Sequence, residues 1–140
     1  MVYTTHRRVL LLGALLAAAL VAAVMVSTSN AASKSSTVTL SEFKVSPSPK
    51  SVSHGKVTFT VKNKGDMEHE LVVIKTSKAA SKLPVSGNRA SDNGAVGEVE
   101  DIASGKSKKL TLNLKAGHYV LMCNLPGHYK GGMRSDFTVK

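Results

Sequence analysis

One stretch near the end of the chain decides the fold that we expect: Tyr119-Val-Leu-Met-Cys-Asn-Leu-Pro-Gly-His-Tyr-Lys-Gly-Gly-Met133. Cys123 is the only cysteine of the chain; His128 follows five residues later, and Met133 five residues after that. The apolar residues before Cys123 predict a strand, and Pro126 and Gly127 favour a tight turn that brings the imidazole back towards the thiol. One compact loop between two strands therefore offers a soft thiolate, an imidazole and a weak thioether.

A second imidazole, that of His69, stands far upstream at the head of an apolar run, Leu71-Val-Val-Ile74. Such a run, rich in β-branched residues, is typical of a strand that is buried on both faces. Two histidines, one cysteine and a long axial methionine form the trigonal donor set that suits an electron-transfer copper ion. We therefore interpret His69, Cys123, His128 and Met133 as the ligands of one copper ion.

Short alternating segments predict an all-β domain in the rest of the chain. The clearest are Val57–Val61 and Leu110–Leu114, where every second residue is apolar. A phase slip at Ser41-Glu42 predicts a bulge or a bend in a first strand, and the prolines of residues 46–50 predict a loop or a sheet edge. The remaining segments expected to be strands are 38–40, 43–45, 71–74, 98–102, 118–123 and 137–139.

The polar stretch 77–97 predicts a long loop with one helical turn near Ala79-Ala80. After residue 32 no segment carries a helical stripe of two turns, so the pattern favours an antiparallel or mixed β-sandwich of about seven strands.

The first 31 residues have the pattern of an export signal. Arg7 and Arg8 precede an apolar run of 18 residues, Val9–Val26, and small polar residues follow. We expect a signal helix in residues 1–31 that is cleaved on export to the periplasm, the cell surface or the medium, with an uncleaved membrane anchor as the alternative. Residues 32–36 are then a linker, and residues 37–140 form one domain.

Charge and cysteine content narrow the range of partners. A lone cysteine cannot form an internal disulfide, so in an exported chain it is intermolecular, reactive or metal-bound. The formal net charge of +10 becomes +8 when Arg7 and Arg8 leave with the signal. The lysines are scattered and no Gly-aromatic RNA motif is present, which argues against nucleic acid. We expect a monomer that meets an acidic redox protein, with a membrane surface or cell wall as a further contact.

The spacing Cys-x4-His-x4-Met after a strand, together with a histidine on an upstream strand, resembles the cupredoxin family of type 1, or blue, copper proteins. The loop from Cys123 to His128 is similar to those of rusticyanin, sulfocyanin and auracyanin, and the resemblance covers about residues 37–140. It implies a Greek-key sandwich in which Cys123, His128 and His69 are equatorial ligands and Met133 is axial. It also implies a one-electron carrier rather than an enzyme.

The sequence departs from the family at one place. Many cupredoxins have asparagine after the upstream histidine, and here Glu70 follows His69 while Glu68 precedes it. A carboxylate near the copper would favour Cu(II), lower the potential, or displace Met133 as the axial ligand.

Copper delivery or resistance is the alternative function, motivated by Met67, Met122, Glu68 and Glu70 near the ligands. A Cys-His nucleophile would need an orienting partner that the sequence does not supply, and zinc would leave the methionine unexplained.

Leu125, Pro126 and Tyr129 are expected to form an apolar docking patch. His54 and His118, which stand beside glycines, are interpreted as turn residues.

Overall fold

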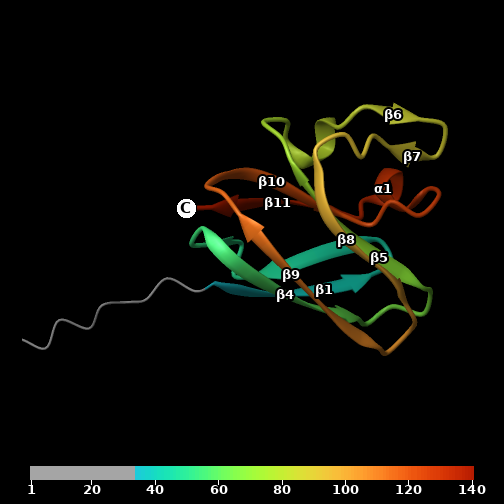
Figure 1. The fold of residues 1–140 in the computed structure, drawn as a ribbon. Helices are drawn as coiled ribbons and strands as arrows, with labels where there is room; N and C mark the ends of the chain where they lie inside the picture. Colours follow the sequence, from blue (N-terminus) through green and yellow to red (C-terminus); the bar gives the residue numbers. More distant parts are fainter. Residues whose placement is uncertain (1–33) are drawn as a thin grey trace, which may run out of the picture. The chain divides into compact units, whose positions relative to one another are not determined.

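The computed structural model describes residues 34–140 (Figure 1). The predicted signal segment, residues 1–31, lies outside the described residues, so cleavage and anchoring stay predictions. Within residues 34–140, no helix has the length and apolar character that crossing a membrane requires.

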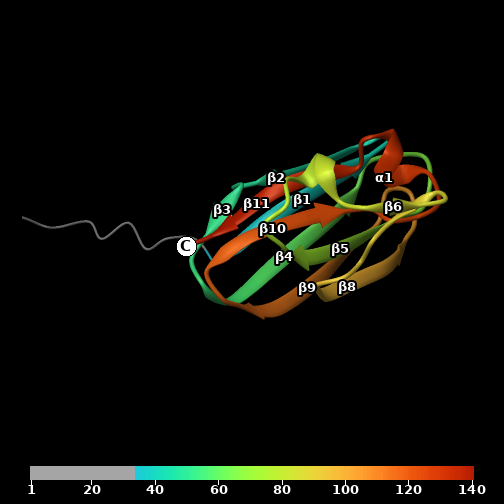
Figure 2. The same cartoon turned by 90° about the horizontal axis from the view of Figure 1, so that it is seen from above.

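Two sheets form a β-sandwich in this part of the chain, as Figures 1 and 2 show. One sheet has the strand order β2-β1-β4-β9 and the other β3-β11-β10-β5-β8. The strands are β1 (Ser35–Ser41), β2 (Lys44–Ser48), β3 (Ser51–Val52), β4 (Gly55–Asn63), β5 (His69–Lys75), β8 (Ala95–Ile102), β9 (Ser107–Leu114), β10 (Gly117–Met122) and β11 (Arg134–Val139). A separate hairpin pairs β6 (Val85–Ser86) with β7 (Arg89–Ala90).

The pairing makes this a mixed sandwich. β1 runs parallel to β4 and antiparallel to β2, while β10 is antiparallel to both of its neighbours, β5 and β11. The pairing of β5 with β10 joins segments that are far apart in the sequence and brings the start of β5 beside the end of β10. The predicted all-β, mixed sandwich is confirmed.

Period-two alternation explains the core. In β4 the side chains of Val57, Phe59 and Val61 are fully buried between the sheets. β10 is buried on both faces: Tyr119 and Leu121 enter the main core, whereas alternate residues enter a second apolar cluster on the outer face. Cys123, which follows β10, continues the phase of Tyr119 and Leu121 and lies in the main core.

Several details differ from the prediction. The described chain has eleven strands rather than about seven, and the extra ones include three of two residues, which are too short to carry a periodic pattern. The phase slip at Ser41-Glu42 is neither a bulge nor a bend in one strand: it is a turn between β1 and β2, formed by Glu42 and Phe43. The prediction of a sheet edge at the prolines is confirmed: Pro47 lies within β2, which is an edge strand and can accommodate a residue that lacks an N–H.

The stretch 77–97 is more ordered than a loop. It contains a 3₁₀ helix, Ala80–Lys82, close to the predicted helical turn, and then the β6–β7 hairpin and the start of β8. His118 is a strand residue of β10, not a turn residue, and its ring contacts Asp136 and the carbonyl oxygen of Thr76. His54 lies between β3 and β4, where a turn residue was expected.

Candidate metal centre

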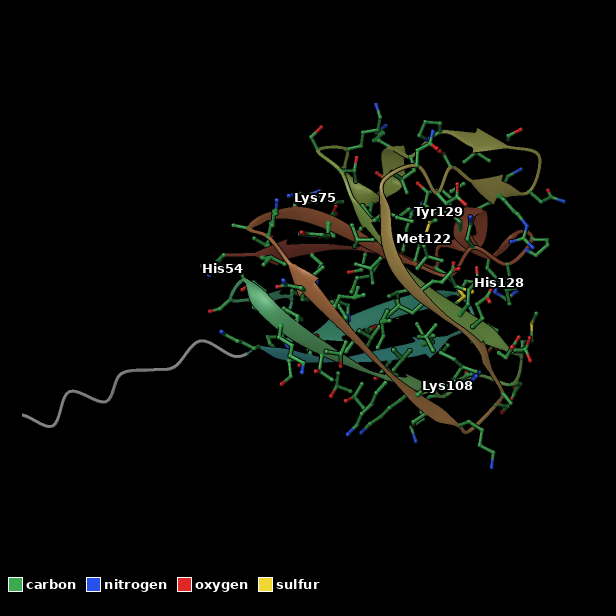
Figure 3. The ribbon with its side chains drawn as sticks, in the orientation of Figure 1. His54, Lys75, Lys108, Met122, His128 and Tyr129 are labelled. Atoms are coloured by element: carbon green, nitrogen blue, oxygen red, sulfur yellow. The ribbon has the colours of Figure 1, made fainter. Side chains whose placement is uncertain are left out.

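Three side chains meet at one end of the sandwich, the end at which Figure 3 places His128, opposite His54. His69 begins β5, Cys123 follows β10, and His128 begins the one-turn helix α1 (His128–Gly131). Their donor atoms lie within 4.8 Å of one another, and all three residues are buried. His69 and Cys123 are 0% exposed and His128 is 5% exposed.

The three donor atoms form a triangle of the size that a metal ion needs. Its sides are 3.2 Å between the two Nδ1 atoms, 3.4 Å from Cys123 Sγ to His128 Nδ1, and 3.8 Å from Cys123 Sγ to His69 Nδ1. The point equidistant from the corners of that triangle lies about 2.0 Å from each donor, which compares with ~2.0–2.1 Å for imidazole and ~2.3 Å for thiolate bonds to zinc. A single ion therefore fits between these side chains without any rearrangement of the backbone.

Backbone hydrogen bonds close the loop that carries Cys123 and His128. The His128 N–H donates to the Leu125 carbonyl at 2.9 Å. The Met133 N–H donates to the His128 carbonyl at 3.0 Å, and the Cys123 N–H donates to the Met133 carbonyl at 3.1 Å. Gly127, at φ 84°, supplies the left-handed turn before α1 that other residues adopt only with strain.

Met133, the fourth predicted ligand, is fully buried and belongs to the same apolar cluster as Cys123. The structure thus brings three of the four predicted ligands together through their donor atoms and places the fourth in the adjoining core. The axial role of Met133 stays a prediction.

Burial shifts the titration of the donors towards their neutral forms. It raises the pKa of the Cys123 thiol, a change that the Glu70 N–H, 3.5 Å from the sulfur, partly opposes. It also lowers the pKa of the His128 imidazole, as does the neighbouring His69. Because a metal ion binds the thiolate, metal uptake at this site is expected to release a proton.

Glu70 braces the ligand loop. Its carboxylate accepts the backbone N–H of Asn124 at 3.0 Å, and burial raises the pKa of this carboxyl. The Asn124 side chain bonds in turn to the backbone of Ala90 in β7, and Arg89 donates to the Asn124 carbonyl at 2.7 Å. Among residues 34–140, the cluster of donor atoms contains neither Glu70 nor the exposed Glu68.

A contact that sequence reasoning missed involves Glu42 in the β1–β2 turn. Its Oε1 lies 2.9 Å from Nε2 of His69 and accepts the Met67 N–H at 2.8 Å. Its Oε2 accepts the Asp66 N–H at 3.2 Å. The Met67 N–H is the main cause that lowers the pKa of Glu42 to about 2. The phase slip marks this turn in the sequence, but no pattern connects it to a histidine 27 residues away.

The exposed surface near the ligands differs from the predicted patch at Tyr129, whereas Leu125 is half-buried. Tyr129 is buried, and its hydroxyl bonds to the backbone of Ala80 and Leu83, so it cannot form part of a docking patch. Phe43 lies edge-on to the His128 ring with 5.7 Å between centroids, and it is 47% exposed. Met67 is 46% exposed and Pro126 is also exposed.

The fold and the donor triangle together define a class: a β-sandwich with a buried His-Cys-His centre that fits a type 1 copper site. The model of the family described as "Cupredoxin-like domain" matches residues 14–133. The chain therefore belongs to the cupredoxin-like family of blue copper proteins, and its cofactor is a single copper ion. The comparison with curated protein sequences gives no match.

Three solved structures illustrate the fold that this chain shares with known proteins. Auracyanin from Roseiflexus castenholzii, in its dithionite-reduced form, is 21% identical, with a TM-score of 0.57 over 78% of this chain and 98% of its own. Rusticyanin from Thiobacillus ferrooxidans is 20% identical, with a TM-score of 0.56 over 77% and 79%. An azurin from Methylomonas sp. strain J is 20% identical, with a TM-score of 0.55 over 76% and 97%.

Proposed function

We propose that this protein is an exported one-electron carrier whose copper ion is bound by His69, Cys123 and His128, with Met133 as the axial ligand. The observation that carries the proposal is the buried triangle of two imidazole nitrogens and one sulfur. Bound copper supplies one-electron chemistry by cycling between Cu(II) and Cu(I).

The residues around the site suit this role because they are held in place and kept dry. The ligands come from the start of β5, the end of β10 and α1, all tied together by backbone hydrogen bonds. A thiolate with no exposed surface is shielded from water and from oxidation. Because the three donor atoms already surround a point about 2.0 Å from each of them, we expect the ligand side chains to move little between the Cu(II) and Cu(I) forms.

We expect electrons to pass through His128, because it is the only one of the three ligands in the donor triangle with exposed surface, 5%, and its ring packs edge-on against the exposed Phe43. A partner that docks over Phe43, Met67 and Pro126 would approach this imidazole. The chain is basic, so we expect the partner to be acidic and the encounter to weaken with salt.

Copper delivery is less well supported. Met122 is fully buried in the second cluster, on the face of β10 opposite Cys123, and the Glu70 carboxylate is engaged with the ligand loop. Of the residues that motivated this alternative, Met67 and Glu68 are exposed, and of these two only the thioether of Met67 is a soft ligand for Cu(I). The buried ligands would also have to open before copper could leave.

Voltammetry of the copper-loaded protein separates the two functions. A carrier should give a reversible one-electron wave and keep its copper in the presence of a Cu(I) chelator over many cycles. Loss of copper to the chelator on reduction, with no return wave, would favour delivery. Fractionation of cells that express the full chain tests export: retention of the protein in the cytoplasm would contradict it.

A further inference from the structure

The β1–β2 turn lies beside the metal centre and contacts both of its imidazoles. Glu42 meets Nε2 of His69 at 2.9 Å, and Phe43 lies edge-on to the ring of His128. Two successive residues of one turn thus reach the two histidines, which stand 59 residues apart in the chain.

Two glycines lie so close to this turn that neither position has room for a side chain. A Cβ atom added to Gly65 would overlap both carboxylate oxygens of Glu42, and one added to Gly131 would lie 2.8 Å from the Phe43 ring. Backbone N–H groups of Asp66 and Met67 hold the carboxylate from the other side. Three groups therefore hold the carboxylate in place, namely two backbone N–H donors and the His69 imidazole. Gly65 leaves the space that the carboxylate occupies.

The consequence for His69 follows from its two ring nitrogens. Nδ1 faces Cys123 and His128, while Nε2 faces Glu42. A neutral imidazole that donates its Nε2 proton to a carboxylate carries its lone pair on Nδ1, which is the form that binds a metal. The negative charge of Glu42 also stabilises Cu(II) more than Cu(I), because Cu(II) carries the larger charge.

We propose that Glu42 is a positioning residue that holds His69 in its metal-binding tautomer and lowers the reduction potential of the site. The proposal deepens the electron-carrier function and rests on it. Phe43 supports Glu42 by anchoring the turn against α1, where Gly131 makes room for its ring.

The test compares Glu42→Gln with Glu68→Gln. Both variants remove one negative charge. Glu42 contacts the His69 ring, whereas Glu68, which precedes His69 in the sequence, is exposed and stands outside the donor cluster. We expect E42Q to raise the Cu(II) dissociation constant by ~10–100-fold and to change that of Cu(I) less. Each tenfold increase in the ratio of the Cu(II) dissociation constant to the Cu(I) dissociation constant raises the midpoint potential by about 59 mV for one electron. E68Q should shift the potential by much less.

Gly65→Ala provides a second variant that leaves every charge in place. Its methyl group occupies the position of the carboxylate, so the flexible Glu42 side chain should turn away and the potential should rise as in E42Q. Glu42→Asp should restore part of the wild-type potential. Equal shifts in E42Q and E68Q, or a wild-type potential in G65A, would overturn the proposal.

A readout on the copper-free protein keeps this test separate from the test of the function. Long-range proton–nitrogen NMR spectra of the apoprotein should show His69 protonated at Nε2 alone, and Glu42→Ala should produce a mixture of tautomers. An unchanged tautomer in E42A would contradict the role of Glu42 even if the electron-carrier function holds. An irreversible wave from the wild-type copper protein would contradict the function and leave the NMR result to decide on Glu42.

Discussion

Removing one oxygen atom from Tyr129 should destabilise the domain far more than most single-atom changes. The Tyr129 hydroxyl donates to the Ala80 carbonyl at 2.5 Å and accepts the Leu83 N–H at 3.1 Å. All three residues are buried, so Tyr129→Phe leaves two backbone groups without a partner. Each such group costs ~1–3 kcal/mol, which gives roughly 2–6 kcal/mol for the pair. At a slope of ~4 °C per kcal/mol for a domain of this size, Tm should fall by at least about 8 °C.

The matched control is Tyr119→Phe, because it deletes the same atom from another buried tyrosine. The Tyr119 hydroxyl makes one hydrogen bond, to the carbonyl of the exposed Lys115 at 2.7 Å, and that carbonyl can turn to water instead. Its loss should cost about 1 kcal/mol. The assay is thermal unfolding of the copper-free proteins by circular dichroism. Equal losses in the two variants would refute the view that Tyr129 joins α1 to the segment before the β6–β7 hairpin.

Three further predictions concern the loop, the turn and the axial position. Gly127→Ala should cost ~1–2 kcal/mol in denaturant unfolding from backbone strain alone, because φ is 84° and an added Cβ meets no atom within 4 Å; a loss near zero would mean that the loop rearranges. The folded-state pKa of Glu42 is about 2 against an ordinary 4.5, so its stabilising effect is fully present above pH 4.5 and disappears as the pH falls from there towards 2. The stability difference between apo wild type and E42Q should shrink over that range, and a constant difference would contradict the assignment. Met133→Leu should retain copper and raise the midpoint potential, and an unchanged midpoint would contradict the axial role of Met133.

Local features of the sequence were enough to predict the centre of the site. Cys123 and His128 belong to one loop, in which Pro126 and Gly127 favour a tight turn. The residues before Cys123 are continuously apolar, as expected of a strand that is buried on both faces. His69 was found because it begins a run that had to be an interior strand, and β5 indeed pairs with β10 on one side and β8 on the other.

The contacts that the sequence did not reveal all depend on packing between distant segments. Glu42 reaches His69 because β1 is paired with β4, which sets the turn beside the start of β5. Tyr129 is buried because the segment of Ala80 and Leu83 folds over α1, which no periodicity indicates. The carboxylate of Glu70 bonds to Asn124 because β5 and β10 meet at that level of the sheet.

The central claim is that two imidazoles and one thiolate hold a single copper ion, and paramagnetic resonance combined with visible absorption tests it most directly. Wild-type protein loaded with Cu(II) should bind one ion per chain, with an intense thiolate-to-copper band and the narrow hyperfine splitting of a type 1 site, and Cys123→Ser should lose both features. A weak band with wide splitting that is the same in wild type and C123S would contradict the account.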